Sequence, residues 1–160
     1  EACIINPSFI LNPLGKAGSS NQLAAFALKK RILLYPRGGK SIVSAEDVAK
    51  APVAALEAGR SGHNYILAGK HVSFKELFKM AAVISGKRKL IAPAPYLLAY
   101  TIALLLTGIE RISGHPINFN IKTLKLMYSS HHYSSAKAET ELNFHPSPSS
   151  EILQQFYENN

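Results

Sequence analysis

The chain has 160 residues, of which 47% are hydrophobic, so it is long and apolar enough to bury one core. This composition excludes a disordered or collagen-like chain. Its 18 Lys and Arg against 10 Asp and Glu give a net charge of +8, which would suit an anionic partner such as nucleic acid, a lipid surface or a phosphate-bearing cofactor.

The positive charges are dispersed along the chain rather than gathered in one basic motif. The two tightest clusters, at 29–31 and 87–89, stand where helices are expected to end, and the helix dipole favours cations there. No platform of aromatic and basic residues and no zinc-binding module accompanies them. We therefore expect no nucleic-acid partner.

The first residues bear on where the protein works. Glu1 is not an initiator Met, and no basic leader with an apolar run follows it, so we expect a processed product or a piece of a longer protein. Cys3 lies in an apolar run and is the only cysteine of the chain. A buried thiol in a reducing, cytoplasmic compartment is the expected reading.

The first half of the chain alternates strand and helix patterns. Residues Ala2 to Leu11 form a short apolar run that predicts a buried strand. Regular pairing should stop near Pro7, because proline has no amide proton to donate. A Gly/Ser loop then leads to a helix over 22–31, and a short strand is expected from Ser41 to Ser44.

Ser44 is expected to cap the next helix. Asp47 occupies the third helical position, from which its carboxylate can reach back to the amide of the cap residue. Pro52 should remove a backbone hydrogen bond and kink this helix. The predicted apolar face consists of Val48, Ala51, Pro52, Ala55 and Leu56.

A strand at Asn64 to Leu67 precedes the clearest helix signal of the chain. Ser73 and Glu76 form a capping box, and Gly86 stands where the helix should end. The apolar face of this helix is predicted to contain Phe74, Leu77, Phe78, Ala81 and Ile84.

The most hydrophobic helix is expected to start at Pro95. The stretch from Pro93 to Ile109 holds 17 uncharged residues, at the lower edge of the roughly 17–25 that span a bilayer. Its two prolines and its glycine favour a buried or partner-covered helix over a membrane contact. Shorter helices at 118–128, 135–142 and 151–157 finish the chain, and the alternation of strands with helices predicts an α/β or α+β fold.

Several motifs resemble known sites without completing them. The GKAG turn at 15–18 has the order of a phosphate-binding turn, but Asn21 stands in place of the third glycine, so we expect no dinucleotide fingerprint. GGKS at 38–41 ends like a phosphate-binding loop but has Leu34 where the leading glycine should be. His131 and His132 are the only close histidine pair, and no further ligand has zinc-site spacing, so no metal site is expected.

Tyr133 and Lys137 have the Tyr-x-x-x-Lys spacing of a dehydrogenase catalytic pair. Such a pair needs a nucleotide-binding half before it and a long helix and strand after it. Only 23 residues follow Lys137, and no complete glycine-rich turn precedes the pair. We interpret the spacing as a coincidence.

Three segments in order carry a family likeness. IINPSFILNP at 4–13 is similar to a strand and loop downstream of a catalytic Tyr-x-x-x-Lys helix. Residues 35–69 are similar to a succession of Gly-Gly, a strand, an Asp-Val-Ala helix, Gly-x-x-Gly and Tyr-x-Leu. The stretch YSSAKAETELNFHPSP at 133–148 is similar to a late signature of Lys-Ala, Glu-Leu and Phe-x-Pro. Together they resemble the C-terminal half of an extended short-chain dehydrogenase/reductase, of the NAD-dependent epimerase/dehydratase and dihydroflavonol-reductase-like kind.

The resemblance implies an α/β chain that is the C-terminal part of a Rossmann-like NAD(P)-binding fold plus a small α/β substrate-binding lobe. Residues 1–160 would be the substrate-binding portion, without the N-terminal dinucleotide-binding half. The catalytic Tyr and Lys would lie before Glu1, so this chain would hold no catalytic residue. Tyr133 and Lys137 would fall in a late helix, far from the chemistry.

The resemblance also assigns site residues. Pro7, Ser8 and Phe9 match a segment that borders the nicotinamide of NAD or NADP. Lys40 falls where sugar-nucleotide members have an arginine for the diphosphate, and because lysine lacks the bidentate fork, a nucleotide-sugar substrate is less favoured. The residues that would bind substrate are Asn12, Ser20, Asn21, Gln22 and Lys40.

On this interpretation the complete enzyme transfers a hydride between the cofactor and a carbonyl or alcohol carbon of a small-molecule substrate. The isolated chain is expected to be inactive, to need the missing half as its partner, and to self-associate through exposed apolar surface. The alternative is a non-enzymatic basic binding module that holds a protein partner or a membrane surface, for which the helix from Pro95 to Ser113 would serve.

Overall fold

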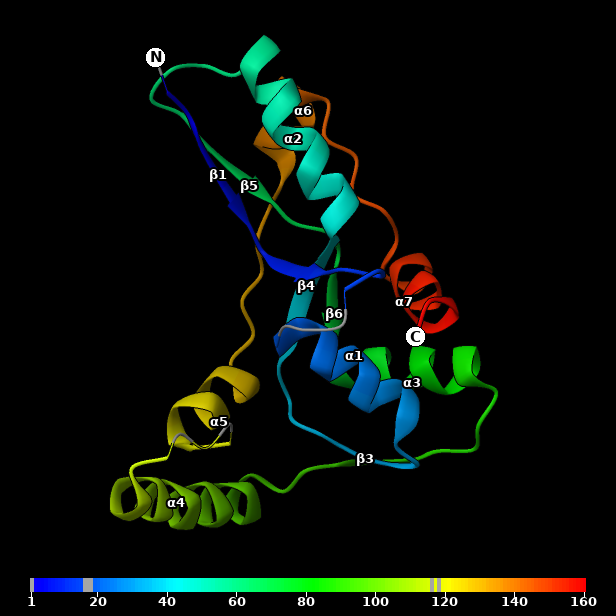
Figure 1. Cartoon of the computed structure of the whole chain (residues 1–160), viewed down its shortest axis with the longest axis vertical. Coiled ribbons are helices and arrows are strands. Elements are labelled where there is room, and N and C mark those ends of the chain that lie inside the picture. The colour runs from blue at the N-terminus through cyan, green and yellow to red at the C-terminus, as the bar shows by residue number, and fades with distance from the viewer. Residues whose placement is uncertain (1, 16–18, 116, 118) are drawn as a thin grey trace.

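Figure 1 shows the computed structural model of the chain, which describes residues 2–15, 19–115, 117 and 119–160. The strands of these residues form three small sheets, which follow one another down the long axis of the molecule. The GKAG turn at 15–18 lies largely outside the described residues. The mixture of strands and helices confirms the predicted α/β class.

The upper sheet pairs β1 (Ile4–Pro7) with β5 (Asn64–Leu67) in parallel, Ile4 opposite Asn64 and Pro7 opposite Leu67. Helices α2 (Ala45–Ala58) and α6 (Ala136–Leu142) pack against it. Their shared core consists of Val43, Ala51, Ala55, Tyr65, Leu67, Ala138, Leu142 and Phe144. Cys3 packs at the margin of this core and is half-buried, so the expectation of a buried thiol is only partly met.

The central sheet has the order β2 (Phe9–Leu11), β4 (Gly39–Ser44), β6 (His71–Ser73). β2 runs parallel to β4, and β6 antiparallel. The predicted break near Pro7 is confirmed, because the first strand run pairs with β5 up to Pro7 and with β4 from Phe9 onward.

Helices α1 (Ser19–Lys29), α3 (Phe74–Ser85) and α7 (Ser149–Glu158) complete the central body. They pack on one another and enclose the larger core, to which Phe74, Leu77, Phe78 and Ala81 contribute from α3. The predicted capping box is confirmed: Ser73 Oγ accepts from the amide of Glu76 at 3.2 Å, and the Glu76 carboxylate accepts from the amide of Ser73 at 2.9 Å.

The lower sheet pairs β3 (Ile32–Tyr35) with β7 (Leu90–Pro93) in parallel. The sequence patterns did not predict β3. From β7 the chain enters α4 (Tyr96–Ser113), which packs on α5 (Ile121–Tyr128). Figure 1 shows α4 lying crosswise at the lower end of the molecule. The sequence predicted a buried or partner-covered helix; Ala103 is the only buried residue of α4, so the chain itself does not bury it, and cover by a partner stays a prediction.

Helix α2 differs from the prediction in the contact of Asp47 and in its buried face. Ser44 caps the helix as predicted, with Oγ accepting from the amide of Asp47 at 2.9 Å. The carboxylate of Asp47 does not turn back to the cap amide: it accepts from the amide of Ser147 at 2.8 Å and from its hydroxyl at 3.2 Å. Pro52 and Leu56 are exposed rather than part of the buried face, and Leu56 is 89% exposed.

Candidate functional site

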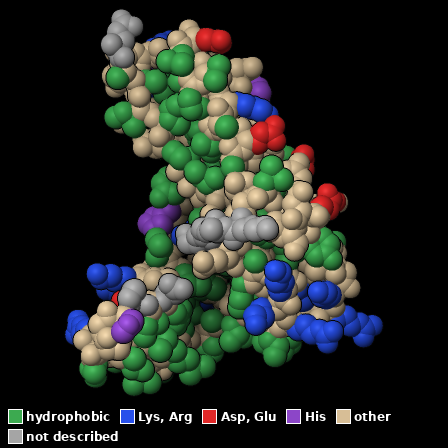
Figure 2. Space-filling model, viewed as in Figure 1, with side chains coloured by type: hydrophobic (Ala, Val, Ile, Leu, Met, Phe, Trp, Pro, Cys, Tyr) green, Lys and Arg blue, Asp and Glu red, His purple; other side chains and the backbone are tan. Residues whose placement is uncertain are grey.

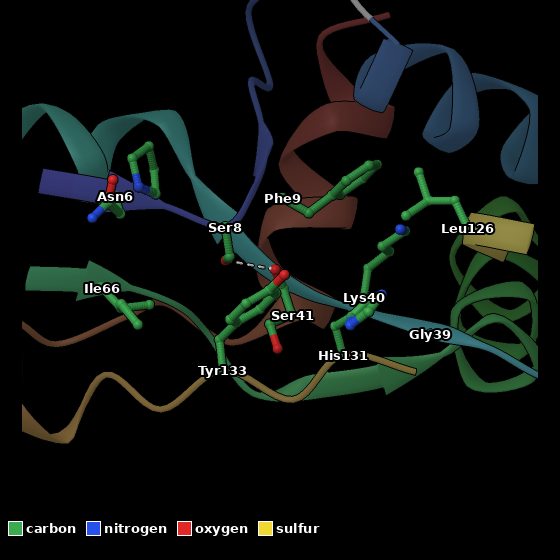
Figure 3. A pocket seen from close by; sticks show the side chains of 11 residues that line it. Asn6, Ser8, Phe9, Gly39, Lys40, Ser41, Ile66, Leu126, His131 and Tyr133 are labelled. Carbon is green, nitrogen blue, oxygen red and sulfur yellow. Dashed lines mark hydrogen bonds between the residues drawn. The ribbon is translucent and has the colours of Figure 1, made fainter. Parts of the chain in front are cut away.

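The break between β1 and β2 opens a cavity of about 460 Å³ between the upper and central sheets. Segments far apart in sequence contribute to its wall: the β1–β2 junction, the start of β4, β5, α5 and the stretch before α6 (Figure 3). The lining residues are Asn6, Pro7, Ser8, Phe9, Gly39, Lys40, Ser41, Ile66, Leu126, His131 and Tyr133.

Ser8 fixes the strand break at the top of the cavity. Its amide donates to the carbonyl of Leu67 at 2.9 Å, and its hydroxyl donates to the carbonyl of Ser41 at 2.8 Å (Figure 3). These two bonds connect the β1–β2 junction to β5 and to β4. The three predicted cofactor-binding residues, Pro7, Ser8 and Phe9, therefore lie together at one wall of the cavity.

Lys40 and Ser41 place an ammonium group and a hydroxyl group at the cavity. Lys40 is half-buried, and burial lowers the pKa of its ammonium group because the charged form loses water. Among the described residues that line the cavity, no Asp or Glu offsets that loss. The Ser41 side chain is buried, and its Oγ has no hydrogen-bond partner within the described part of the chain. Both groups would be satisfied by an anionic or hydrogen-bonding ligand.

The Gly-Gly pair before Lys40 is required by packing rather than by phosphate binding. A Cβ on Gly38 would collide with the carbonyl oxygen of Met127 at the end of α5. A Cβ on Gly39 would lie 2.5 Å from Nε2 of His71 and 2.6 Å from the carbonyl oxygen of Val72. The two glycines thus let α5 and β6 approach β4, which brings Leu126 to the cavity.

Tyr133 lies at the cavity and not on the late helix in which the family resemblance placed it. It belongs to an extended stretch before α6, lines the cavity and is half exposed. Lys137 is on α6, with Nζ 5.0 Å from the centroid of the Tyr65 ring. The expectation that both residues share a late helix far from the site is wrong for Tyr133, because the helix begins only at Ala136. The helix predicted at 135–142 already left Tyr133 outside, but no periodicity in the sequence could show that Tyr133 lines the cavity.

The other predicted substrate-binding residues lie apart from the cavity. Asn21 is buried, and its side-chain oxygen accepts a hydrogen bond from the amide of Asn12 at 3.0 Å. Its side-chain nitrogen donates to the carbonyls of Asn12 at 3.1 Å and Gly15 at 2.6 Å. Asn21 and Gln22 line a separate hollow between α1 and the C-terminal helix. Of the predicted substrate-binding set, only Lys40 lines the same cavity as Pro7, Ser8 and Phe9. The roles of Asn12, Ser20, Asn21 and Gln22 stay predictions.

A histidine pair borders the same region. The rings of His71 and His132 lie with centroids 3.9 Å apart, and Nε2 of His71 is 3.2 Å from the hydroxyl of Ser130. Burial lowers the pKa of His71, and the neighbouring His132 acts in the same direction. Within the described residues, no three His, Cys, Asp or Glu side chains gather as metal ligands would.

Comparisons with known proteins identify the fold. No protein-family model and no curated protein sequence matches the chain. Among solved structures, gox2253 is 26% identical over 98% of this chain, with a TM-score of 0.74. A nucleoside-diphosphate-sugar epimerase from Pseudomonas aeruginosa is 19% identical over 98% of this chain, with a TM-score of 0.69. A UDP-glucose 4-epimerase from Thermotoga maritima, solved with UDP-glucose, is 17% identical over 98%, with a TM-score of 0.62.

The same comparisons define how much of such a protein is present. The chain covers 48%, 47% and 45% of these three solved chains, so it spans about half their length. The predicted family resemblance is confirmed in the fold, and the predicted class, part of a Rossmann-like α/β fold, is confirmed with it. The chain therefore has the fold of about one half of solved chains that include two sugar-nucleotide epimerases.

Proposed function

We propose that this chain is the substrate-binding half of an NAD- or NADP-dependent, cytoplasmic oxidoreductase or epimerase, dihydroflavonol-reductase-like in its segment order, that acts on a carbonyl or alcohol carbon. The observation that carries the proposal is the cavity in which Pro7, Ser8 and Phe9 face Lys40 and Ser41, on a fold shared with epimerases. One solved relative, from Pseudomonas aeruginosa, holds NADPH, and another, from Bacillus cereus, holds UDP-glucuronic acid and NAD.

The open edge of β1 supports a second half as partner. Within the described residues, β1 pairs only with β5, whereas parallel sheets are normally covered on both faces and extended by further strands. Ile4 is 58% exposed beside a hollow of about 490 Å³, which Cys3, Ile5 and the exposed Leu56 help to line. A dinucleotide-binding half that adds strands to β1 would cover this surface.

The cavity residues suit a polar, negatively charged ligand. Lys40 would meet an anionic group such as a phosphate. The Ser41 hydroxyl, which has no partner among the described residues, would donate or accept a hydrogen bond. Pro7, Ser8 and Phe9 would border the nicotinamide, which when bound supplies or accepts the hydride. The catalytic tyrosine and lysine would come from the other half.

Two experiments test this proposal. The isolated chain should neither bind NADPH stoichiometrically nor catalyse turnover, and Tyr133→Phe should change neither result. Tight NADPH binding with turnover that Tyr133→Phe abolishes would refute the half-site assignment.

In a protein that carries both halves, Lys40→Met should lower the affinity for phosphate-bearing ligands by about tenfold or more, because a charge-assisted hydrogen bond is lost. Lys40→Arg is the matched control and should retain most of the affinity. Equal affinities for Lys40→Met and the parent protein would contradict the role of Lys40.

A non-enzymatic basic binding module is the second candidate function. The exposed helix α4 favours it, because α4 offers an apolar surface away from the cavity. Sedimentation with nucleic acid and with lipid vesicles at low and high salt, combined with NADPH binding by a protein that carries both halves, separates the candidates, because only the oxidoreductase would bind NADPH. A module would pellet strongly and release with salt, and its binding would be independent of any cofactor.

A further inference from the structure

Helix α4 leaves most of its large apolar side chains exposed, while two of its polar side chains, Thr107 and Glu110, face the protein. Thr107 Oγ1 accepts from the amide of Ile121 at 3.2 Å, and the Glu110 carboxylate accepts from the side-chain amide of Asn120 at 3.3 Å, so both polar side chains face α5. This is the reverse of a helix on a soluble surface. The exposed large apolar residues are Tyr96, Leu97, Leu98, Ile102, Leu104, Leu105, Ile109 and Ile112.

The apolar surface continues from α4 onto the lower sheet. Leu34 of β3 lines a hollow of about 190 Å³ together with Leu98 and Ile102 of α4, and Ile32 and Leu90 are each 63% exposed. Figure 2 shows this surface as a broad apolar region at the lower end of the molecule. Contiguous exposed apolar surface of this kind marks a protein or membrane contact.

Positive charge lies at both ends of this surface. Residues 29–31 precede β3 and residues 87–89 precede β7, and because the two strands are parallel, both clusters lie at the same end of the strand pair. At the other end, Arg111, Lys122 and Lys125 are exposed. Figure 2 shows Lys and Arg at both lower corners and most acidic side chains above.

Acidic residues are nearly absent from the segment that surrounds α4 in the sequence. Between 86 and 128 the sequence has six Lys or Arg and a single acid, Glu110, whose carboxylate is bonded to Asn120. A second copy of the chain on this surface would bring two basic borders together, which like-charge repulsion opposes. Anionic lipid head groups would instead complement the basic residues while α4 enters the acyl boundary.

We propose that α4, with the exposed residues of β3 and β7, docks the protein on the surface of a bilayer that contains anionic lipids. Helix α4 has the length and apolarity of a membrane span, but it lies flat across the lower end and is bonded to α5 along one side. It therefore lies in the plane of the interface, about 27 Å long, rather than crossing the bilayer. The inference is independent of the proposed catalytic role.

Flotation with lipid vesicles tests the proposal on this chain. The chain should float with phosphatidylcholine vesicles that contain a quarter phosphatidylserine, and weakly with pure phosphatidylcholine. Leu105→Asp should reduce the bound fraction by about tenfold, because an aspartate must leave water to enter the apolar boundary. Leu56→Asp is the matched control: Leu56 is 89% and Leu105 68% exposed, but Leu56 lies on α2 at the opposite end. It should bind like the parent chain.

A fluorescence measurement tests membrane contact of α4 without changing the charge of the chain. The chain has no Trp, so a single Trp reports on its own surroundings. Leu105→Trp should shift its emission to the blue on addition of the anionic vesicles, and Leu56→Trp should not. Failure to float, equal flotation of Leu105→Asp, or a lipid-independent dimer that Leu105→Asp dissociates would each overturn the proposal, the last in favour of a second copy.

Discussion

Helices α3 and α4 are both strongly apolar, yet only one of them is buried. Helix α3 places Phe74, Leu77, Phe78 and Ala81 in the core between the central sheet, α1 and α7. Helix α4 is longer, and only Ala103 is buried. The comparison shows that apolarity indicates that a helix needs covering, while its place in the fold decides whether the chain itself provides the cover.

The largest effect should come from deleting core volume on α3. Phe78→Ala should lower the free energy of unfolding by about 3–5 kcal/mol, because Phe78 is 2% exposed and its removal leaves a cavity. Leu105→Ala on α4 should change it by less than about 0.5 kcal/mol. Urea unfolding of both variants measures the difference. Similar losses would mean that α4 is buried in solution, for example by self-association.

The junction between the central body and the α4–α5 pair should be the next most sensitive place. Gly38→Ala should cost about 1–3 kcal/mol, because the new Cβ collides with the carbonyl of Met127. Gly108→Ala, on α4, has open space around its Cβ and should stabilise the helix by about 0.5–1 kcal/mol. Thermal unfolding would distinguish the two, and a stabilising Gly38→Ala would show that α5 does not approach β4 as described.

The helix caps offer a smaller contrast. Ser73→Ala removes the capping box of α3 and should cost about 1 kcal/mol. Thr101→Ala on α4 removes only a hydroxyl that donates to the carbonyl of Leu98, and it should be neutral within a few tenths of a kcal/mol. Chemical denaturation of the two variants side by side is the measurement. An equal cost would argue against the capping role of Ser73.

The smallest effect concerns pH at His71. Burial holds the folded-state pKa of His71 below the ordinary value of 6.5, and His132 acts in the same direction. A hydrogen bond with the backbone of His131 and the charge of Glu76 oppose both. The unfolded chain therefore takes up the proton first, and stability falls as the pH drops from about 6.5 toward the folded-state pKa. His71→Gln should flatten this part of the stability curve. An unchanged slope in the variant would assign the acid sensitivity to another group.

Local signals in the sequence determined the elements that depend on neighbouring residues. The capping box at Ser73 and Glu76, the C-cap at Gly86 and the strand break at Pro7 are all confirmed. These features depend on one backbone amide or one dihedral angle, which a few adjacent residues control. The order of three family-like segments likewise indicated the fold, which the solved structures confirm.

Tertiary structure alone decided which distant residues meet. Asp47 binds Ser147, one hundred residues away, instead of its own cap amide. Tyr133, Ser8 and Lys40 line one cavity. Leu56, which was predicted to lie on the apolar face of α2, is exposed. The fate of α4 was decided in the same way. Hydrophobic period and residue spacing describe one element at a time, whereas burial and cavity lining depend on the path by which the backbone brings separate elements together.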